Sequence, residues 1–181
     1  MIYLQDATKA DLKEIKRLYK RAFPRLERKR FALIERKARE GLSKILAVKD
    51  ENEEFCGLMI TAAYDGVMLL DYFAISEDVR EKGIGTKALS DFLKRFENEY
   101  RIFLEIELPS GEDDLKNRRK NFYLRNGLKQ SGTEVTLCSV PMELLYYTEN
   151  VSFEEYQRLY QVVFGDKLAQ KVKFVKQRKN F

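Results

Sequence analysis

The segment Arg80-Glu-Lys-Gly-Ile-Gly85 has the residue types and spacing of an anion-binding loop. It follows an apolar run at residues 67–75 and precedes a stretch whose apolar residues recur at helical spacing. A helix N-terminus carries about four backbone N–H groups without intrahelical acceptors, and a partial positive charge. Glycine at such a position lets a ligand approach the backbone, because no Cβ intervenes. The segment therefore predicts a phosphate or pyrophosphate site.

Carboxylates and phenols elsewhere in the chain could carry acid–base chemistry. Glu105 and Glu107 alternate with apolar residues, which places both carboxylates on one face of an expected strand. Either could take a proton from an amine, directly or through water, and Asp71 on the neighbouring strand is a third choice. A tyrosine could act as a general acid, since the reference pKa of a phenol is about 10. The alternatives are salt-bridged carboxylates and a tyrosine packed on the sheet.

The form Arg-x-x-Gly-x-Gly after a strand resembles the acyl-CoA pyrophosphate loop of the GCN5-related N-acetyltransferase (GNAT) superfamily. It matches neither the P-loop, which needs Gly-Lys-Ser/Thr, nor the dinucleotide fingerprint Gly-x-Gly-x-x-Gly. A second segment, Phe122-Tyr-Leu-Arg-Asn-Gly-Leu128, resembles the superfamily's later motif Phe-Tyr-x-x-x-Gly-Phe, with Leu128 replacing the final Phe. The resemblance implies acetyl-CoA as cosubstrate.

The same resemblance implies how acetyl-CoA would bind. Backbone groups of residues 73–75 would pair with pantetheine like an added strand, and the glycine loop would surround the pyrophosphate. The expected cofactor-binding residues are Phe73, Ala74, Ile75, Arg80, Glu81, Lys82, Gly83, Ile84, Gly85, Thr86, Asn117 and Phe122. Relatives often place an Asn where this chain has Lys116, and Asn117 lies one position later, which puts its contact in doubt.

The resemblance also implies roles for the catalytic candidates. Tyr123 would donate a proton to the departing thiolate of CoA. Glu105 would be the general base, because Leu104-Glu-Ile106 resembles the Leu-Glu-Val of ribosomal-protein N-terminal acetyltransferases, and Glu107 is the backup. Direct attack of the amine on the thioester requires no enzyme nucleophile and hence neither cysteine.

The implied activity is acetyl-CoA-dependent N-acetylation of a primary amine on a small molecule, a peptide or a protein. One alternative is a non-catalytic GNAT-fold module that senses acyl-CoA or binds nucleic acid through its basic chain ends. Another is an interaction protein built around C-terminal helices. Binding of acyl-CoA would distinguish the interaction protein from the other two. Turnover would distinguish the acetyltransferase from the non-catalytic module.

Hydrophobic periodicity predicts the element order β-α-α-β-β-β-α-β-α-β-β over residues 1–147, which is the GNAT topology. The expected fold class is α/β (α+β), with a mixed, mostly antiparallel sheet of about seven strands flanked by helices. Thr8 with Asp11 predicts the start of a first helix, and a second is expected at about residues 27–39.

The C-terminal part of the chain is expected to be a helical appendage. Ser152 with Glu155 predicts the start of a helix, and residues 167–177 could form another. We therefore expect residues 1–149 to form the acetyltransferase domain and residues 150–181 to pack on it. A homodimer through this appendage is an open alternative.

Composition excludes several classes of site. The 181 residues include no histidine, which excludes histidine triads, ligands and proton shuttles. No carboxylates or cysteines have metal-ligand spacing, so no metal is expected. Cys56 and Cys138 lie in strand-like segments and are expected to be reduced core residues of a cytoplasmic protein. No apolar run reaches the roughly 20 residues that span a bilayer, so no membrane partner is expected.

The positive charge is concentrated near the N-terminus. Residues 1–40 contain 13 Lys/Arg and 6 Asp/Glu, a net charge of +7, whereas the whole chain carries +5. Such a segment can hold nucleic acid, an anionic membrane or an acidic partner, or can be a solvated helix face. Nucleic acid is not expected, because no aromatic-basic RNA motif accompanies the charge. The basic helices favour an acidic acceptor.

Overall fold

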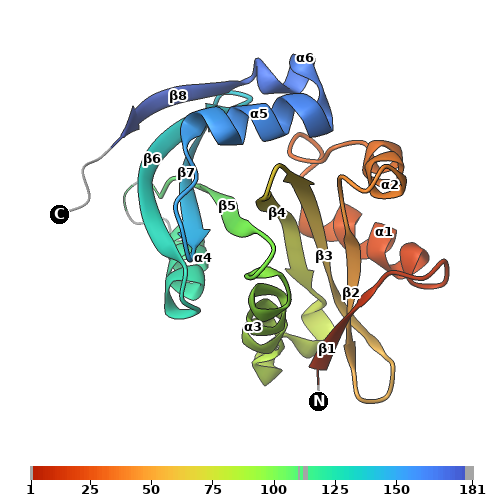
Figure 1. Ribbon diagram of the computed structural model, residues 1–181. Coiled ribbons are helices and arrows are strands. Elements are labelled where there is room, and N and C mark those ends of the chain that lie inside the picture. The colour runs from red at the N-terminus through yellow and green to blue at the C-terminus, as the bar shows by residue number, and fades with distance from the viewer. Residues whose placement is uncertain (1, 110, 112–113, 178–181) are drawn as a thin grey trace. The chain divides into compact units, whose positions relative to one another are not determined.

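The computed structural model of the chain (Figure 1) describes residues 2–109, 111 and 114–177, with the side chains of residues 80–82 and 114 excepted. The chain forms two compact units. Unit 1 consists of Met1–Ala62 and Leu70–Arg95, and unit 2 of Ala63–Leu69 and Phe96–Phe181.

The strands form an eight-stranded sheet of order β1-β2-β3-β4-β5-β7-β6-β8, and helices flank it. The strands are β1 (Ile2–Asp6), β2 (Ile45–Asp50), β3 (Phe55–Tyr64), β4 (Val67–Ile75), β5 (Arg101–Glu107), β6 (Lys129–Leu137), β7 (Val140–Tyr147) and β8 (Val172–Gln177). The helices are α1 (Asp11–Ala22), α2 (Phe31–Arg39), the 3₁₀ helix η1 (Glu77–Lys82), α3 (Ile84–Phe96), α4 (Asp114–Arg125), α5 (Phe153–Phe164) and α6 (Asp166–Ala169). The predicted fold class is confirmed.

In unit 1, an apolar stripe of α1 lies in a core with strands β2, β3 and β4. The buried members of this core are Ile15, Leu18, Tyr19, Ile34, Ala47, Leu58, Ile60, Tyr72 and Ala74. The start of α1 uses the expected pair: Thr8 N donates to Asp11 Oδ2 at 2.9 Å, and Asp11 N donates to Thr8 Oγ1 at 3.3 Å. Regular helix begins only at Asp11, because residues 9–10 form a turn.

The second helix is shorter than predicted, since α2 begins at Phe31 and not near residue 27. Buried phenols hold the backbone of the preceding residues. Tyr19 Oη donates to Lys29 O at 3.0 Å. Tyr72 Oη donates to Glu27 O at 2.9 Å and accepts from Lys29 N at 3.0 Å. Buried polar groups require partners, so these long-range bonds override the local preference for helix.

In unit 2, β4 and β5 are parallel, with Val67–Leu69 in register with Arg101–Phe103. Strand β7 pairs antiparallel with both β5 and β6. The turn between β6 and β7 holds Cys138 and Ser139 at φ values of 50° and 70°. The expectation for Cys138 is wrong, because this residue is exposed at the turn, whereas Cys56 is buried as predicted.

The C-terminal region corrects a third expectation. Helix α5 begins as predicted, with Glu155 N donating to Ser152 Oγ at 3.2 Å and Ser152 N donating to Glu155 Oε2 at 2.9 Å. Residues 167–177, however, contain only the end of the one-turn α6 and then β8, which lies beside β6 (Figure 1). Pairing with β6 supplies the backbone partners of this segment, and the sheet gains an eighth strand. Among the described residues, no helix is long and apolar enough to cross a bilayer.

Candidate active site

The predicted anion loop lies in unit 1, between the end of β4 and the start of α3. Gly83 has φ 67° and ψ 13°, a left-handed conformation that favours glycine. A Cβ at this residue would meet no other heavy atom within 4 Å, so the space beside it is open. Lys87 N donates to Gly83 O at 3.2 Å, so Gly83 begins the hydrogen-bond ladder of α3. The amides of Ile84, Gly85 and Thr86 lie in the first turn, where the helix itself supplies no acceptor.

The side chains of the loop are also expected to contact the cofactor. Those of Arg80, Glu81 and Lys82 lie outside the described part of the structure, so their roles stay predictions. The backbone of η1 is described, and it leads directly into Gly83. What the structure supports here is an arrangement of backbone, suited to an anion at the N-terminus of α3.

The end of β4 is shaped by a close approach to β3. A Cβ on Gly57 would lie 2.5 Å from Ala74 O and 2.8 Å from Ile75 Cδ1, so only glycine fits. Ser76 N donates to Cys56 O at 2.8 Å just beyond this contact. These two features fix the backbone of the segment that the sequence assigns to pantetheine.

Asp71, the third choice of general base, forms a buried ion pair in unit 1. Its Oδ1 lies 2.6 Å from Lys29 Nζ, and the two side chains are 6% and 10% exposed. Burial raises the pKa of Asp71, and the ammonium of Lys29 opposes that rise. Removing either partner would leave an uncompensated buried charge. The pair therefore fastens the turn before α2 to β4, and a structural role accounts for Asp71.

In unit 2, the carboxylate of Glu105 is half-buried and points toward α5. Tyr160 Oη donates to Glu105 Oε1 at 2.6 Å. Two residues earlier on the same face of β5, the ring of Phe103 packs against Tyr156 at 5.6 Å between centroids. Arg101, earlier still, forms an ion pair with Glu155. Helix α5 thus covers the face of β5 that carries the first candidate base.

Glu107 lies at the end of β5 and contacts α4 instead. Its Oε2 is 3.0 Å from Lys116 Nζ. Lys116 occupies the position that relatives often give to Asn, and in this chain it pairs with a carboxylate. Asn117 Nδ2 donates to Gly111 O at 3.5 Å, a long bond from α4 to the loop that precedes it.

Tyr123 lies on α4 and is half-buried, with its ring 5.3 Å from that of Phe122. Burial raises the pKa of Tyr123 to about 12, and the charge of Arg119 opposes the rise. The phenol therefore keeps its proton throughout the neutral range. That is the protonation state a general acid needs.

The site residues predicted from the sequence fall into two sets, one in each unit. Phe73–Thr86 belong to unit 1, and Glu105, Glu107, Asn117, Phe122 and Tyr123 to unit 2. The first set consists of a strand end and a helix start. The second consists of side chains from β5 and α4.

Comparison with known proteins identifies the family. The profile of the Acetyltransferase (GNAT) family matches residues 12–127, which is well over half of the chain. The chain belongs to the GNAT family.

Individual relatives agree with that assignment. The GNAT chain is 30% identical over 115 residues to "Putative acetyltransferase YjbC" of Bacillus subtilis (strain 168). The match covers 59% of this chain and 57% of that relative, so the chain spans less than two thirds of its length.

Solved structures share the fold. A GNAT-family protein of Bacteroides thetaiotaomicron has a TM-score of 0.75 at 22% identity, over 91% of this chain and 99% of that one. Spermidine N-acetyltransferase from Vibrio cholerae, solved in complex with CoA and spermine, has a TM-score of 0.63 at 13% identity, over 86% and 97%. At these identities the likeness shows the GNAT fold alone.

Two residues of the GNAT chain were missed by the sequence argument. Gly57 carried a signal, because an isolated glycine inside a strand pattern often marks a close backbone approach. Tyr160 carried none, since it lies in an amphipathic helix beyond residue 127, where the family profile ends. Only the pairing of β5 with α5 brings it to Glu105.

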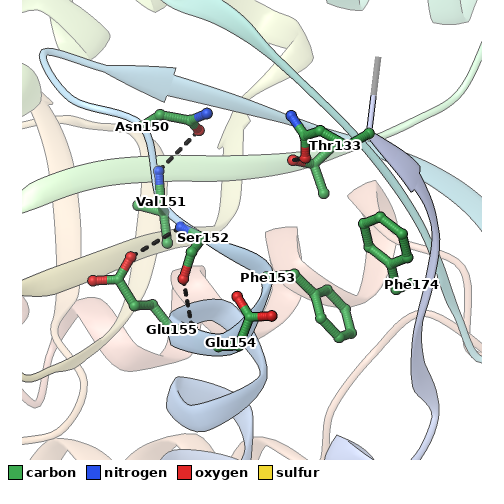
Figure 2. Close-up of a pocket in the computed structure, with 9 residues that line it drawn as sticks. Thr133, Asn150, Val151, Ser152, Phe153, Glu154, Glu155 and Phe174 are labelled. Carbon is green, nitrogen blue, oxygen red and sulfur yellow. Dashed lines mark hydrogen bonds between the residues drawn. The ribbon is translucent and has the colours of Figure 1, made fainter. Parts of the chain in front are cut away.

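A groove elsewhere on unit 2 of the GNAT chain is lined by none of the predicted site residues. It is formed by Thr133, Asn150, Val151, Ser152, Phe153, Glu154, Glu155, Phe174 and Gln177. Figure 2 shows the rings of Phe153 and Phe174 beside each other and the bonds between Ser152 and Glu155. Ser152 and Glu155 cap α5, and Thr133 Oγ1 donates to Gln177 Oε1 at 2.6 Å. We assign this groove no chemistry. Within the described ranges, no cluster of three or more Cys, Asp or Glu could hold a metal.

Proposed function

We propose that this GNAT-family chain transfers the acetyl group of acetyl-CoA to a primary amine. The observation that carries the proposal is Gly83, whose left-handed backbone and open surroundings lie at the N-terminus of α3 inside the motif Arg-x-x-Gly-x-Gly. A pyrophosphate there would accept bonds from the first-turn amides and gain from the positive end of the helix.

In this proposal, the rest of CoA uses the end of β4. Main-chain groups of Phe73, Ala74 and Ile75 pair with pantetheine, in the manner of an added strand. The contact between Gly57 and Ala74 keeps that backbone in one conformation. Arg80, Lys82 and Thr86 add positive charge and a hydroxyl near the phosphates, Glu81 and Ile84 contribute backbone, and Phe122 and Asn117 contact the cofactor from α4.

The reaction is a direct displacement. Glu105 takes a proton from the ammonium form of the acceptor, and the neutral nitrogen attacks the thioester carbonyl. The C–N bond forms as the C–S bond breaks, and Tyr123 gives its proton to the CoA thiolate. The nitrogen loses a second proton as it becomes an amide, which restores the phenol of Tyr123, and Glu105 releases the first proton to solvent. Glu107 is the second choice of base, because protonating it would break its ion pair with Lys116. Positioning of the two reactants supplies much of the acceleration.

The acceptor is an amine on a small molecule, a peptide or a protein. The complex of the Vibrio cholerae relative contains CoA and spermine, so an amine acceptor is compatible with this fold. The basic residues of the first 40 favour an acceptor with acidic groups over a polyamine. A homodimer through residues 150–181, a cytoplasmic location and the boundary at residue 149 stay predictions.

Titration with acetyl-CoA, followed by a CoA-release assay against a panel of amines, tests the proposal. A ligand at 100 times its Kd stabilises a protein by about 2.7 kcal/mol, which is visible as a thermal shift. We expect binding and turnover with at least one amine. No heat of binding and no thermal shift would refute the proposal. Binding without turnover would favour the acyl-CoA-sensing module instead.

A further inference from the structure

Helix α5 meets β5 through contacts that repeat along both elements. Alternation places Arg101, Phe103 and Glu105 on one face of β5. Each of them has a partner on α5: an ion pair with Glu155, a ring contact with Tyr156 and a hydrogen bond from Tyr160. The three contacts fix the rotation of α5 about its axis, and this rotation places the phenol of Tyr160 within hydrogen-bonding distance of Glu105.

We propose that Tyr160 is a positioning residue for Glu105. This inference rests on the proposed function, in which Glu105 is the general base. The bond from Tyr160 Oη to Glu105 Oε1 is 2.6 Å long, a length typical of a hydroxyl donating to a carboxylate. It makes α5 part of the catalytic apparatus, although this helix lies beyond the part of the chain that matches the family profile.

The bond can orient Glu105 without consuming its capacity as a base. A carboxylate has about four lone-pair positions on its two oxygens, and Tyr160 occupies one of them. The flexible side chain of a glutamate would otherwise sample several rotamers. Holding it in one rotamer removes the entropy cost of ordering the side chain in each turnover. A donor to the charged form also keeps the carboxylate ionised at lower pH.

Tyr160 is itself held firmly. Its side chain is fully buried, at 0% exposure. Its ring lies 5.1 Å from that of Tyr156 and 5.0 Å from that of Phe164, centroid to centroid. The start of α5 is fixed by the reciprocal bonds of Ser152 and Glu155. The hydroxyl therefore sits on a rigid element, as a group that orients a catalytic side chain must.

Tyr160→Phe tests the inference, since it removes the hydroxyl and keeps the ring contacts. We expect kcat to fall about tenfold, the loss typical of one charge-assisted hydrogen bond. We also expect the acid side of the kcat–pH profile to move to higher pH, because the ionised carboxylate loses a donor. The KM for acetyl-CoA should not change. A purely structural bond would alter the melting temperature and leave the pH profile in place.

Tyr156→Phe is the matched control, being the same chemical change one turn earlier on α5, over Phe103. It should leave the pH profile where it is. In a Glu105→Gln background, adding Tyr160→Phe should cost nothing further, because the base it positions is gone.

An unshifted profile in Tyr160→Phe, or an equal shift in Tyr156→Phe, would overturn the inference. So would a further loss of kcat when Tyr160→Phe is added to Glu105→Gln. These outcomes are distinct from a failure of the proposed function, which would show as no turnover in the unaltered chain.

Discussion

The two sets of candidate residues are built in different ways. In unit 1, the part of the expected CoA site that the structure describes is mainly backbone: a left-handed glycine, the first amides of α3 and a strand end held by Gly57. In unit 2, the expected chemistry belongs to side chains, and the first candidate base, Glu105, is held by Tyr160, a partner distant in sequence. A site built from backbone tolerates changes of side chain but not changes of backbone conformation. A site built from side chains is sensitive above all to the loss of a functional group.

The difference determines how each unit responds to substitution. Conformational changes in unit 1 should reduce affinity for CoA and leave the chemical step alone. Isosteric changes of the catalytic candidates Glu105 and Tyr123 in unit 2 should reduce turnover and leave the affinity for CoA unchanged.

The largest effect is expected from Tyr123→Phe. Loss of the general acid should lower kcat by about 10²- to 10³-fold, while the Kd for CoA changes less than about twofold. The pKa of Tyr123 is about 12, so the phenol stays protonated to about pH 10 and should cause no alkaline fall in rate below that pH. Steady-state kinetics and calorimetry measure both quantities. A parallel loss of affinity would mean that Tyr123 holds the cofactor.

The second largest effect is expected at the buried ion pair of Lys29 with Asp71, which gives Asp71 a structural role. Lys29→Met should lower the free energy of unfolding by about 3 kcal/mol, because it leaves a buried carboxylate unpaired. Adding Asp71→Asn should recover most of this loss, in both chemical denaturation and turnover. If turnover stayed low while stability returned, Asp71 would have a catalytic role after all.

A smaller effect is expected from Gly83→Ala, which strains a left-handed backbone at the anion loop. We expect roughly tenfold weaker CoA binding, together with a loss of stability of about 1 kcal/mol. Gly41→Ala is the matched control. Gly41 has φ 75° and open space around it, but it lies at the end of α2. The control should lose similar stability and no affinity; equal affinities in the two variants would contradict the backbone site.

The smallest effect concerns the contact that anchors α5. Arg101 lowers the pKa of Glu155 from its ordinary value of 4.5. The folded state thus gains stability above that value and loses it as pH falls through the lower folded pKa. The loss should be below about 1 kcal/mol, since the two side chains are 30% and 37% exposed.

Glu155→Gln isolates this term, because an amide can still cap the helix. Its melting temperature should fall less on acidification than that of the unaltered chain. An identical fall in both proteins would assign the acid sensitivity to other carboxylates.

Sequence reasoning succeeded where local chemistry decides. Three features follow from nearby residues alone: the position of Gly83 between a strand and a helix, the capping pair of Ser152 and Glu155, and the bounds of β4. The role of the glycine loop in binding an anion stays a prediction. It failed where distant partners decide. Bonds from Tyr19 and Tyr72 delay the start of α2, and pairing with β6 turns residues 172–177 into a strand.

The candidate site follows the same division. The glycine loop can be predicted from the sequence, because glycines at these positions indicate the backbone conformation of the loop. The partner of Glu105 is not, because a tyrosine in an amphipathic helix looks the same whether it fills a core or orients a carboxylate.

Strand β8 has one more consequence, for the behaviour of the chain in concentrated solution. It is the outermost strand beside β6, and its exposed face carries Lys173 and Lys176. An uncovered sheet edge is a template on which other chains can add strands, and lysines discourage this by repulsion and by their need for water. Strand β8 covers the edge of β6, so shortening the chain before residue 172 would expose that longer edge to the addition of other strands.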